Sequence, residues 1–334
     1  MALAWFARWS FFCGLLIGAA IVGKATAAES HPVLRRLEYA RNAAERLDYT
    51  GILLSQQGPL IHTSRMTHKY HPKEAIERIE MLDGPPNEIL RRGEEIIWFL
   101  PRERRVLIDR QVGARSFPGL AQFNNAQLLD HYRFKLLDKD RVAGRESIVV
   151  QLQPLDNLRY GYRFWFDTSS GLLLRAQSIS EQGDVVAQIG FSEVTIGFLP
   201  NSRLRERVAD THGWRTEKAI TGPADVSGWV FRLPKGFSRL AAQRRVISAS
   251  HSGIGEARDV IQIICSDGLA SISIFIEPWT AARSLNPVQE GPINMVGKRI
   301  GKFWLTIVGE VPMAAIREVA DTLEITAPDT KSTP

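Results

Sequence analysis

The alternation of apolar and polar residues predicts a chain built mainly from short β-strands, with helices near its two ends. Over Pro32–Leu47 apolar residues recur at helical spacing, with arginine and glutamate between them. A second helix is expected over Ala126–Tyr132, where Asn125 can act as the cap. A third covers Met313–Leu323, and Pro312 stands at or near its start. The sequence between these helices follows a period of two, so the predicted class is α+β, mainly antiparallel β.

Four consecutive strands are expected in the middle of the chain. They cover Ser147–Gln153, Arg159–Phe166, Leu172–Ser180 and Val185–Ile196. Turn residues recur at intervals of about 8 to 12 residues, which is typical of antiparallel sheets. The segments are too short and too closely spaced for strands that alternate with crossover helices. We therefore expect a meandering sheet.

A second unit is expected to begin near Val226. Its clearest element is a hairpin, in which Val260–Cys265 and Leu269–Glu277 flank the turn Ser266-Asp267-Gly268. Phe303–Val308 reads as a further strand ahead of the terminal helix. This second unit is predicted to be a small α+β domain.

The expected organisation follows from these patterns. The segment between the two units carries Arg203, Arg205, Arg207 and Lys218 without a periodic apolar stripe, which predicts an exposed linker. The predicted parts are a leader over 1–28, a large β-rich domain over 29–200, the linker over 201–225, a smaller domain over 226–327 and a disordered polar tail over 328–334.

The first 28 residues have the layout of a secretory signal peptide. Arg8 supplies a positive start, Trp9–Val22 is an apolar run, and Ala25–Ala28 offers an A-x-A cleavage site. An uncut N-terminal anchor is the alternative, although the run is short for a membrane span. Cleavage would leave an unlipidated protein in the periplasm.

Composition and charge narrow the range of partners. Of 42 basic residues, Arg8 and Lys24 lie in the leader, and 36 acidic residues oppose the rest, so the exported chain carries about +4. This mild charge favours lipid phosphates or an acidic protein segment, and no nucleic-acid partner is expected. Only Cys265 remains after cleavage; it lies in an apolar run and is expected to be a buried small residue.

The motifs that would indicate catalysis or metal binding are missing from the sequence. No C-x-x-C, H-E-x-x-H or G-x-S-x-G pattern occurs. His62, His68 and His71 lie on expected strands and should not converge on a metal. We expect no catalytic residue, no metal and no cofactor, and therefore a protein that is not an enzyme.

One feature of the predicted sheet stands out as a candidate binding surface. Alternation places Tyr160, Tyr162, Phe164 and Phe166 on one side of a strand, and Ile148, Val150 and Leu152 on one side of its expected neighbour. An ordinary core face packed by the Pro32–Leu47 helix fits this pattern. A lipid cavity in a strongly curved sheet with the helix as a lid also fits, because such a cavity is a core left partly open.

Four segments in order resemble the MucB/RseB family of periplasmic regulators of an extracytoplasmic-stress sigma factor. They are Leu82–Gly93 (LDGPPNEILRRG), Arg159–Asp167 (RYGYRFWFD), Ser266–Ser273 (SDGLASIS) and Thr306–Pro312 (TIVGEVP). The resemblance spans nearly the whole exported chain. It implies a LolA-like half-open β-barrel with a helical lid, which would be the lipid-sensing domain, and a smaller C-terminal α+β domain.

The resemblance also implies an activity based on binding. The protein would bind the periplasmic part of a membrane-spanning anti-sigma factor of the RseA/MucA type and shield it from a site-1 protease. Lipid or lipopolysaccharide in the half-barrel would loosen this contact, because a ligand shifts an equilibrium by its differential affinity for the two states. The seven apolar residues named above are then the candidate lipid cavity.

The C-terminal domain is expected to carry most of the partner contact, for which the resemblance gives no residue-level motif. Exposed basic clusters supply weak candidates, namely Arg244, Arg245, Lys298 and Arg299, and ordinary solvated surface is the alternative. A periplasmic lipid or lipoprotein carrier of the LolA type and an exported hydrolase are the other functions considered. A homo-oligomer is left open.

Overall fold

The computed structural model describes residues 31–110, 117, 125–197, 211–247, 258–280 and 286–326. They form two compact units. The N-terminal unit contains the described residues up to 155 and those in 160–219, and the C-terminal unit contains 156–159 and the described residues from 220 onward. The predicted signal peptide and the predicted tail lie outside the described residues. No helix in the described part combines the length and apolarity that spanning a membrane requires.

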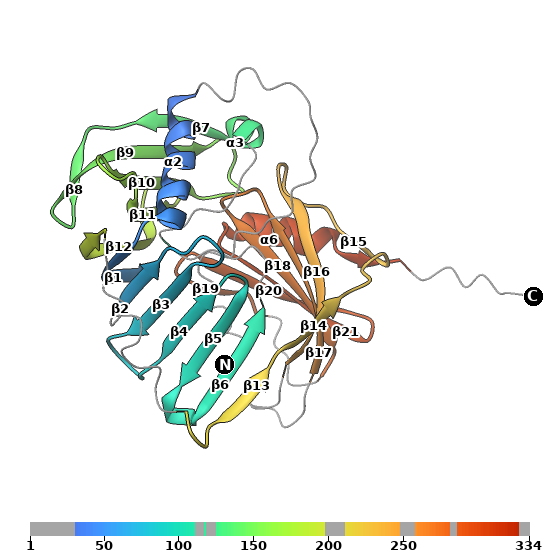
Figure 1. Ribbon diagram of the computed structural model, residues 1–334. Coiled ribbons are helices and arrows are strands. Elements are labelled where there is room, and N and C mark those ends of the chain that lie inside the picture. The colour runs from blue at the N-terminus through green and yellow to red at the C-terminus, as the bar shows by residue number, and fades with distance from the viewer. Residues whose placement is uncertain are drawn as a thin grey trace, which may run out of the picture. The chain divides into compact units, whose positions relative to one another are not determined.

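An open sheet, in which nearly all neighbouring strands are antiparallel, forms the N-terminal unit (Figure 1). Its strands are β1 (Tyr49–Gln57), β2 (Leu60–Lys69), β3 (Ile76–Met81), β4 (Glu88–Arg92), β5 (Glu95–Leu100), β6 (Arg105–Arg110), β7 (Tyr132–Leu136), β8 (Asp140–Val142), β9 (Arg145–Pro154), β10 (Gly161–Asp167), β11 (Leu173–Ile179), β12 (Val185–Ile196) and β13 (Arg215–Lys218). The strand order is β13-β6-β5-β4-β3-β2-β1-β12-β11-β10-β9-β7, and β8 pairs with β9. Only β13 and β6 pair in parallel among these strands, so the predicted antiparallel class is confirmed.

Helix α2 (Pro32–Arg46) crosses in front of β7, β9, β10 and β11 (Figure 1). Its start is fixed locally, because Nδ1 of His31 accepts a hydrogen bond from the amide of Val33 at 3.3 Å and proline occupies the first turn. The ring of Tyr39 lies over Gly171, where a Cβ atom would come within 2.3 Å of the ring and where φ is +77°. Glycine is therefore needed at this contact with the helix. The helix predicted over Pro32–Leu47 is confirmed.

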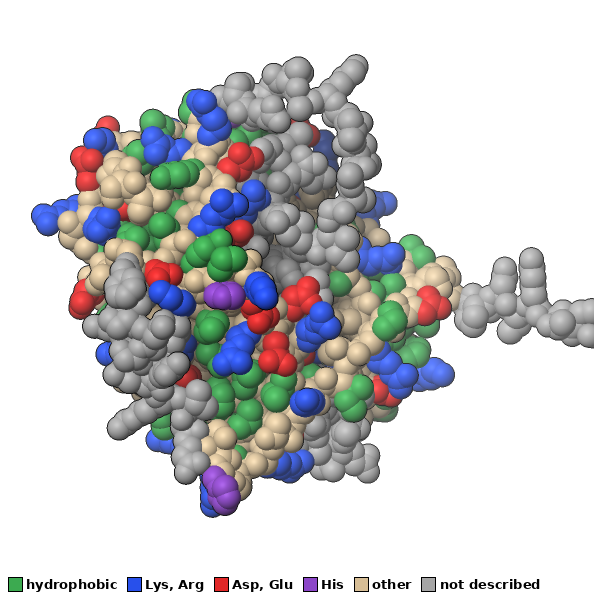
Figure 2. Space-filling view, in the orientation of Figure 1, with side chains coloured by type: hydrophobic (Ala, Val, Ile, Leu, Met, Phe, Trp, Pro, Cys, Tyr) green, Lys and Arg blue, Asp and Glu red, His purple; other side chains and the backbone are tan. Residues whose placement is uncertain are grey.

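The half of this sheet that contains β3, β4, β5 and β6 is stabilised by a smaller apolar cluster and by ion pairs. Its buried apolar cluster is small and centres on Leu90, Phe99 and Val106. A largely buried ion pair joins Arg78 on β3 to Glu88 on β4 at 2.6 Å. Basic and acidic side chains intermingle over this part of the sheet in Figure 2. Two shorter elements complete the unit, the 3-10 helix η1 (Pro101–Glu103) and α3 (Asn125–His131), the second of which matches its prediction within one residue.

A second antiparallel sheet forms the C-terminal unit, in the order β14-β16-β17-β18-β21-β20-β19. Its strands are β14 (Ile220–Pro223), β16 (Ser238–Ile247), β17 (Arg258–Ser266), β18 (Ser271–Pro278), β19 (Val288–Glu290), β20 (Ile293–Ile300) and β21 (Phe303–Gly309). A two-stranded ladder joins β15 (Trp229–Val230) to β22 (Glu324–Ile325). The hairpin expected around Asp267-Gly268 is the β17–β18 pair.

Helix α6 (Met313–Thr322) packs on β20 and β21 and closes the core of the C-terminal unit. Its buried face consists of Ala315, Ile316, Val319 and Ala320, which repeat at helical spacing. They meet fully buried aliphatic side chains of the sheet, such as Ile274 and Ile307. The predicted terminal helix is confirmed.

The predicted linker over 201–225 differs from the structure in its second half. Residues 201–210, with Arg203, Arg205 and Arg207, lie outside the described residues. Beyond them, Arg215–Lys218 form β13 and Ile220–Pro223 form β14. Both are four-residue strands at the edge of a sheet, and all their side chains are exposed or half-buried, so no apolar alternation indicates them in the sequence.

Candidate functional site

The seven candidate lipid-binding residues lie together on one face of the N-terminal sheet. The register places Leu152 opposite Tyr162, Val150 opposite Phe164 and Ile148 opposite Phe166. Along β10 the rings stack, with centroids 5.7 Å apart for Tyr162 and Phe164 and 6.0 Å apart for Phe164 and Phe166. We call this surface the aromatic face; it consists of Ile148, Val150, Leu152, Tyr160, Tyr162, Phe164 and Phe166.

The aromatic face is covered in the structure and packed as a core. Six of its seven side chains are at most 5% exposed, and Ile148 is half-buried. Phe134 of β7 continues the face and meets the ring of His31 at the start of α2, 5.2 Å away. Tyr160 directly precedes β10 and is buried with the rest. The arrangement joins the predicted residues as one surface, which a ligand can reach only if the cover moves.

The turn between β10 and β11 anchors one end of the aromatic face through Asp167. Burial alone would raise the pKa of this carboxyl group. Hydrogen bonds from Arg145, Ser170 and Ser169 outweigh that cost and lower the pKa to about 2. Arg145 contributes two of them, from Nε at 2.9 Å and from a terminal nitrogen at 3.0 Å. The carboxylate therefore fixes the turn from which both strands extend.

The opposite face of the same strands carries arginine on tryptophan. The guanidinium groups of Arg163 and Arg175 lie 5.9 and 5.3 Å from the ring centre of Trp165. The indole nitrogen of Trp165 donates to Asp140 at 2.8 Å, which lowers the pKa of that carboxyl group. Sequence reasoning missed this arrangement, although the alternation that points four aromatic residues inward also points Arg163 and Trp165 outward.

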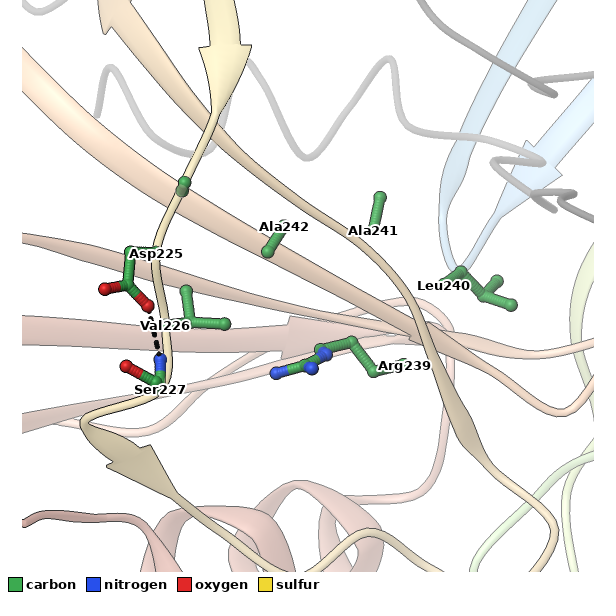
Figure 3. Close-up of a pocket in the computed structure, with 8 residues that line it drawn as sticks. Asp225, Val226, Ser227, Arg239, Leu240, Ala241 and Ala242 are labelled. Atoms are coloured by element: carbon green, nitrogen blue, oxygen red, sulfur yellow. Dashed lines mark hydrogen bonds between the residues drawn. The ribbon is translucent and has the colours of Figure 1, made fainter.

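A hollow of about 350 Å³ lies in the C-terminal unit. It is lined by the chain ahead of β15 and by the first half of β16 (Figure 3). Arg239 extends across it toward Asp225 and Ser227, whose backbone amide donates to the Asp225 carboxylate at 2.9 Å. Small side chains such as Ala241 and Ala242 leave the space open. Its lining suits a small charged group better than an acyl chain.

The four basic residues proposed for partner contact all lie in the C-terminal unit but do not form one cluster. Arg244 pairs with Asp259 on the neighbouring strand, and Arg245 donates to Gln262 at 3.1 Å. Lys298 donates to the carbonyl groups of Ala320 and Leu323 and so caps the end of α6. Its ammonium group therefore has a structural role.

Arg299 is stacked on the ring of Trp279, with its guanidinium carbon 3.9 Å from the ring centre. The tryptophan is more than a third exposed, so the pair forms a patch at the surface. This tryptophan was not singled out from the sequence, since an isolated aromatic residue ahead of a loop carries no periodic signal.

A buried ion pair lies inside the C-terminal unit. Arg159 donates to Asp267 at 2.6 Å and to the carbonyl group of Lys235 at 2.5 Å, and both charged side chains are almost fully buried. Asp156 provides a second carboxylate at 3.0 Å, and the guanidinium group lies over the ring of Phe237. The arginine is therefore neutralised and hydrogen-bonded at once, as a buried charge requires.

The isolated thiol and the imidazole of His68 have structural positions. Burial raises the pKa of Cys265 to about 12, so the thiol is protonated and unreactive at neutral pH. His68 is buried against the ring of Tyr49 and contacts the carbonyl oxygen of Leu47 at 2.7 Å. Within the described residues, no three metal-binding side chains of histidine, cysteine, aspartate or glutamate come together.

Comparison with known proteins identifies relatives that match both units. The MucB/RseB N-terminal domain matches residues 33–208, and the MucB/RseB C-terminal domain matches residues 223–324. The sigma factor AlgU regulatory protein MucB of Pseudomonas aeruginosa is 28% identical over 319 residues, which cover 92% of this chain and 94% of the relative. The sigma-E factor regulatory protein RseB of Escherichia coli K12 is 25% identical and covers 95% of this chain and 98% of its own.

Solved structures show the same fold. MucB in complex with MucA(peri) superposes with a TM-score of 0.67 at 23% identity and covers 88% of this chain and 99% of its own. A structure of MucB by itself gives a TM-score of 0.62. The match extends over both units and over nearly the full length of each relative. The chain belongs to the MucB/RseB family.

Proposed function

We propose that this protein is a periplasmic regulator that binds the periplasmic part of a transmembrane anti-sigma factor of the MucA/RseA type. The observation that carries the proposal is the match of both units, in order, to a family whose curated members are sigma factor regulatory proteins. A solved relative was captured with MucA(peri), which is the class of partner proposed here. Bound to the partner, the protein shields it from site-1 proteolysis.

The partner-binding half of the proposal is tested with the chain that lacks residues 1–28 and the periplasmic domain of a MucA/RseA-type anti-sigma factor. We expect a stable complex by calorimetry and slower cleavage of the partner by the site-1 protease when the complex is present. Absence of binding would overturn the proposal. If the partner binds but is cleaved at the same rate, the proposal would be limited to binding of the partner.

We further propose that lipid or lipopolysaccharide releases the partner by entering the aromatic face. This surface supports the proposal because it gathers seven apolar side chains on strands that α2 crosses (Figure 1), and Ile148 at one end is half-buried. Acyl chains that replace α2 on this face would bury comparable apolar area. Release then follows if the opened form has lower affinity for the partner.

The test of the lipid step uses substitutions inside and outside the aromatic face. Val150→Thr, Tyr162→Ser and Phe164→Ser add polarity inside it, and the first nearly preserves side-chain shape. Ile61→Ser is the matched control, since Ile61 is 61% exposed on another strand. We expect the three inner variants to require more lipopolysaccharide for partner release, and the control to behave as the wild type. Unchanged release in Val150→Thr and in whichever other inner variants fold would disprove the assignment.

Partner contact through the C-terminal unit is a separate proposal. Arg244 and Arg299 are its best candidates, because both guanidinium groups lie at the surface, while Lys298 is engaged in capping α6. Arg244→Glu and Arg299→Glu in the full chain should weaken the complex, and Arg92→Glu in the N-terminal unit is the control. Equal affinity of all three variants would remove these residues from the interface.

A further inference from the structure

The outer side of strands β7, β9 and β10 carries a row of basic and amide side chains. Because Phe134 and Leu152 point to the aromatic face, their neighbours Lys135 and Gln151 point to the other side. Lys135 lies opposite Gln151, and Gln151 lies opposite Arg163. The same alternation places Arg133 on this side, two residues before Lys135. We call Arg133, Lys135 and Arg163 the outer basic face.

The charge of the outer basic face is not compensated by the described residues around it. Arg133 and Lys135 are exposed, Arg163 is half-buried, and none of the three has an ion pair with a described residue. Nearby carboxylates are engaged, since Asp140 accepts from Trp165 and Asp167 from Arg145. The adjoining segment 138–146 has three basic and three acidic side chains, so it is neutral overall and leaves the net charge of the outer basic face positive.

The composition of this face distinguishes between partners. Its central large apolar side chains, Val149 and Trp165, are at most 4% exposed, and the tryptophan is covered by Arg163 and Arg175, while the exposed Leu155 lies at the edge, directly after β9. A specific protein interface draws most of its energy from exposed apolar or aromatic anchors at its centre, and the outer positions of β9, β10 and β11 present none. Charges and amides without such anchors suit an array of phosphate groups.

We propose that the outer basic face docks the protein on the surface of an anionic phospholipid bilayer. Its basic side chains lie on strands that span about 10 Å from β7 to β10, given a strand spacing near 4.8 Å. That spread matches several phosphate groups of a lipid surface better than one small anion. This contact involves lipid headgroups on the side of the sheet opposite the aromatic face. It neither requires nor excludes the binding of acyl chains to the aromatic face. The proposal therefore does not rest on the proposed function.

The proposal is tested by sedimentation with vesicles, using the chain that lacks residues 1–28. Vesicles of phosphatidylglycerol and phosphatidylcholine should bind the protein, and vesicles of phosphatidylcholine alone should not. Binding should weaken as salt rises, because screening shortens the reach of each charge. A basic residue near an anionic surface contributes roughly fivefold in affinity, so Arg133→Gln/Lys135→Gln should bind about 25-fold more weakly.

A matched control separates a specific face from overall charge. Arg92→Gln/Arg102→Gln removes two exposed arginines, one at the end of β4 and one in η1, from another part of the N-terminal unit and changes net charge equally. We expect this double variant to bind anionic vesicles less than about threefold more weakly than the wild type. The variant Arg133→Lys/Lys135→Arg should bind them as the wild type does. Equal losses in the two glutamine variants would overturn the proposal. So would equal binding to both kinds of vesicle, or binding to an acidic peptide with none to anionic vesicles.

Discussion

The aromatic face of the N-terminal unit and the core of the C-terminal unit bury apolar side chains to a similar extent but differ in construction. The C-terminal core consists of aliphatic side chains such as Ile274 and Ile307, locked beneath the four buried residues of α6. The aromatic face combines rings whose neighbouring centroids are about 6 Å apart with the aliphatic side chains of β9, and α2 crosses in front of these strands (Figure 1). Equal burial therefore does not imply equal resistance to opening.

The physical distinction lies in what each surface would lose on opening. Interlocked branched side chains leave cavities when displaced, and the surrounding structure fills such cavities poorly. Aromatic pairs are stable in both offset-stacked and edge-to-face geometries, so the rings of the aromatic face have more than one favourable packing arrangement. The C-terminal core also contains the Arg159–Asp267 pair, which would become an uncompensated charge if the core separated. We infer that the C-terminal unit is the rigid part.

The largest expected effect tests that rigidity. Asp267→Ala leaves Arg159 buried without its innermost partner, which should cost about 3–5 kcal/mol of unfolding free energy. Hydrogen exchange in β17 and β18 measures the loss. Asp156→Ala is the control and should cost less, because Asp156 is partly exposed. Equal effects would mean that the buried pair does not distinguish the C-terminal core.

An intermediate effect is expected at the end of the aromatic face. Asp167 has a folded-state pKa of about 2 against an ordinary value of 3.8, so its ionised form stabilises the fold by about 2 kcal/mol at neutral pH. This contribution is complete above pH 4 and is lost as pH falls toward 2. Asp167→Asn should therefore be less stable at pH 7, and the difference should vanish near pH 2. Urea unfolding at a series of pH values checks the sign, and a difference independent of pH would contradict it.

Smaller substitutions compare the two surfaces directly. Ile307→Val in the C-terminal core and Phe164→Leu on the aromatic face should each cost about 1 kcal/mol. A saturating acyl ligand should offset only the second loss, because only the aromatic face is proposed to admit it. Hydrogen exchange in β21 and β10, with and without ligand, makes the comparison. An offset in both strands would remove the distinction between the two surfaces.

The smallest effect is expected at the surface of the C-terminal unit. Arg244 and Asp259 form an exposed pair, and such pairs contribute little because both ions remain hydrated. Arg244→Gln should leave the midpoint of urea unfolding unchanged within error. A marked shift would mean that the rim of this unit, and not only its core, determines its stability.

The sequence allowed the aromatic face to be predicted because its residues follow a strict period of two. That period fixed which side of β10 holds Tyr162 and Phe164, and the structure agrees. It could not reveal whether the face is empty or filled, since an open cavity and a packed core require the same side chains. The Pro32–Leu47 helix was equally accessible, because six of its residues form one buried stripe.

Other features depend on contacts that no local pattern encodes. Strand β16 was not predicted, since SRLAAQRRVI mixes basic and apolar residues and contains an irregularity in register between Arg239 and Ala241. The partners of Lys298 and Arg299 were also invisible, because a lysine that caps a helix 22 residues away looks like any basic residue in sequence. Tertiary structure, not composition, separates a structural cation from a surface one.

The position of Arg159 has a consequence for how the chain is made. Arg159 lies on a four-residue segment that the chain completes between two strands of the N-terminal unit, yet its carboxylate partner Asp267 comes 108 residues later. During synthesis the arginine must therefore remain solvated until the β17–β18 hairpin has left the ribosome. A fragment that begins after the N-terminal unit would lack this residue permanently and would fold around an unopposed aspartate. The C-terminal unit is thus synthesised last but includes a segment that was synthesised early. Its complete folding therefore requires the full-length chain.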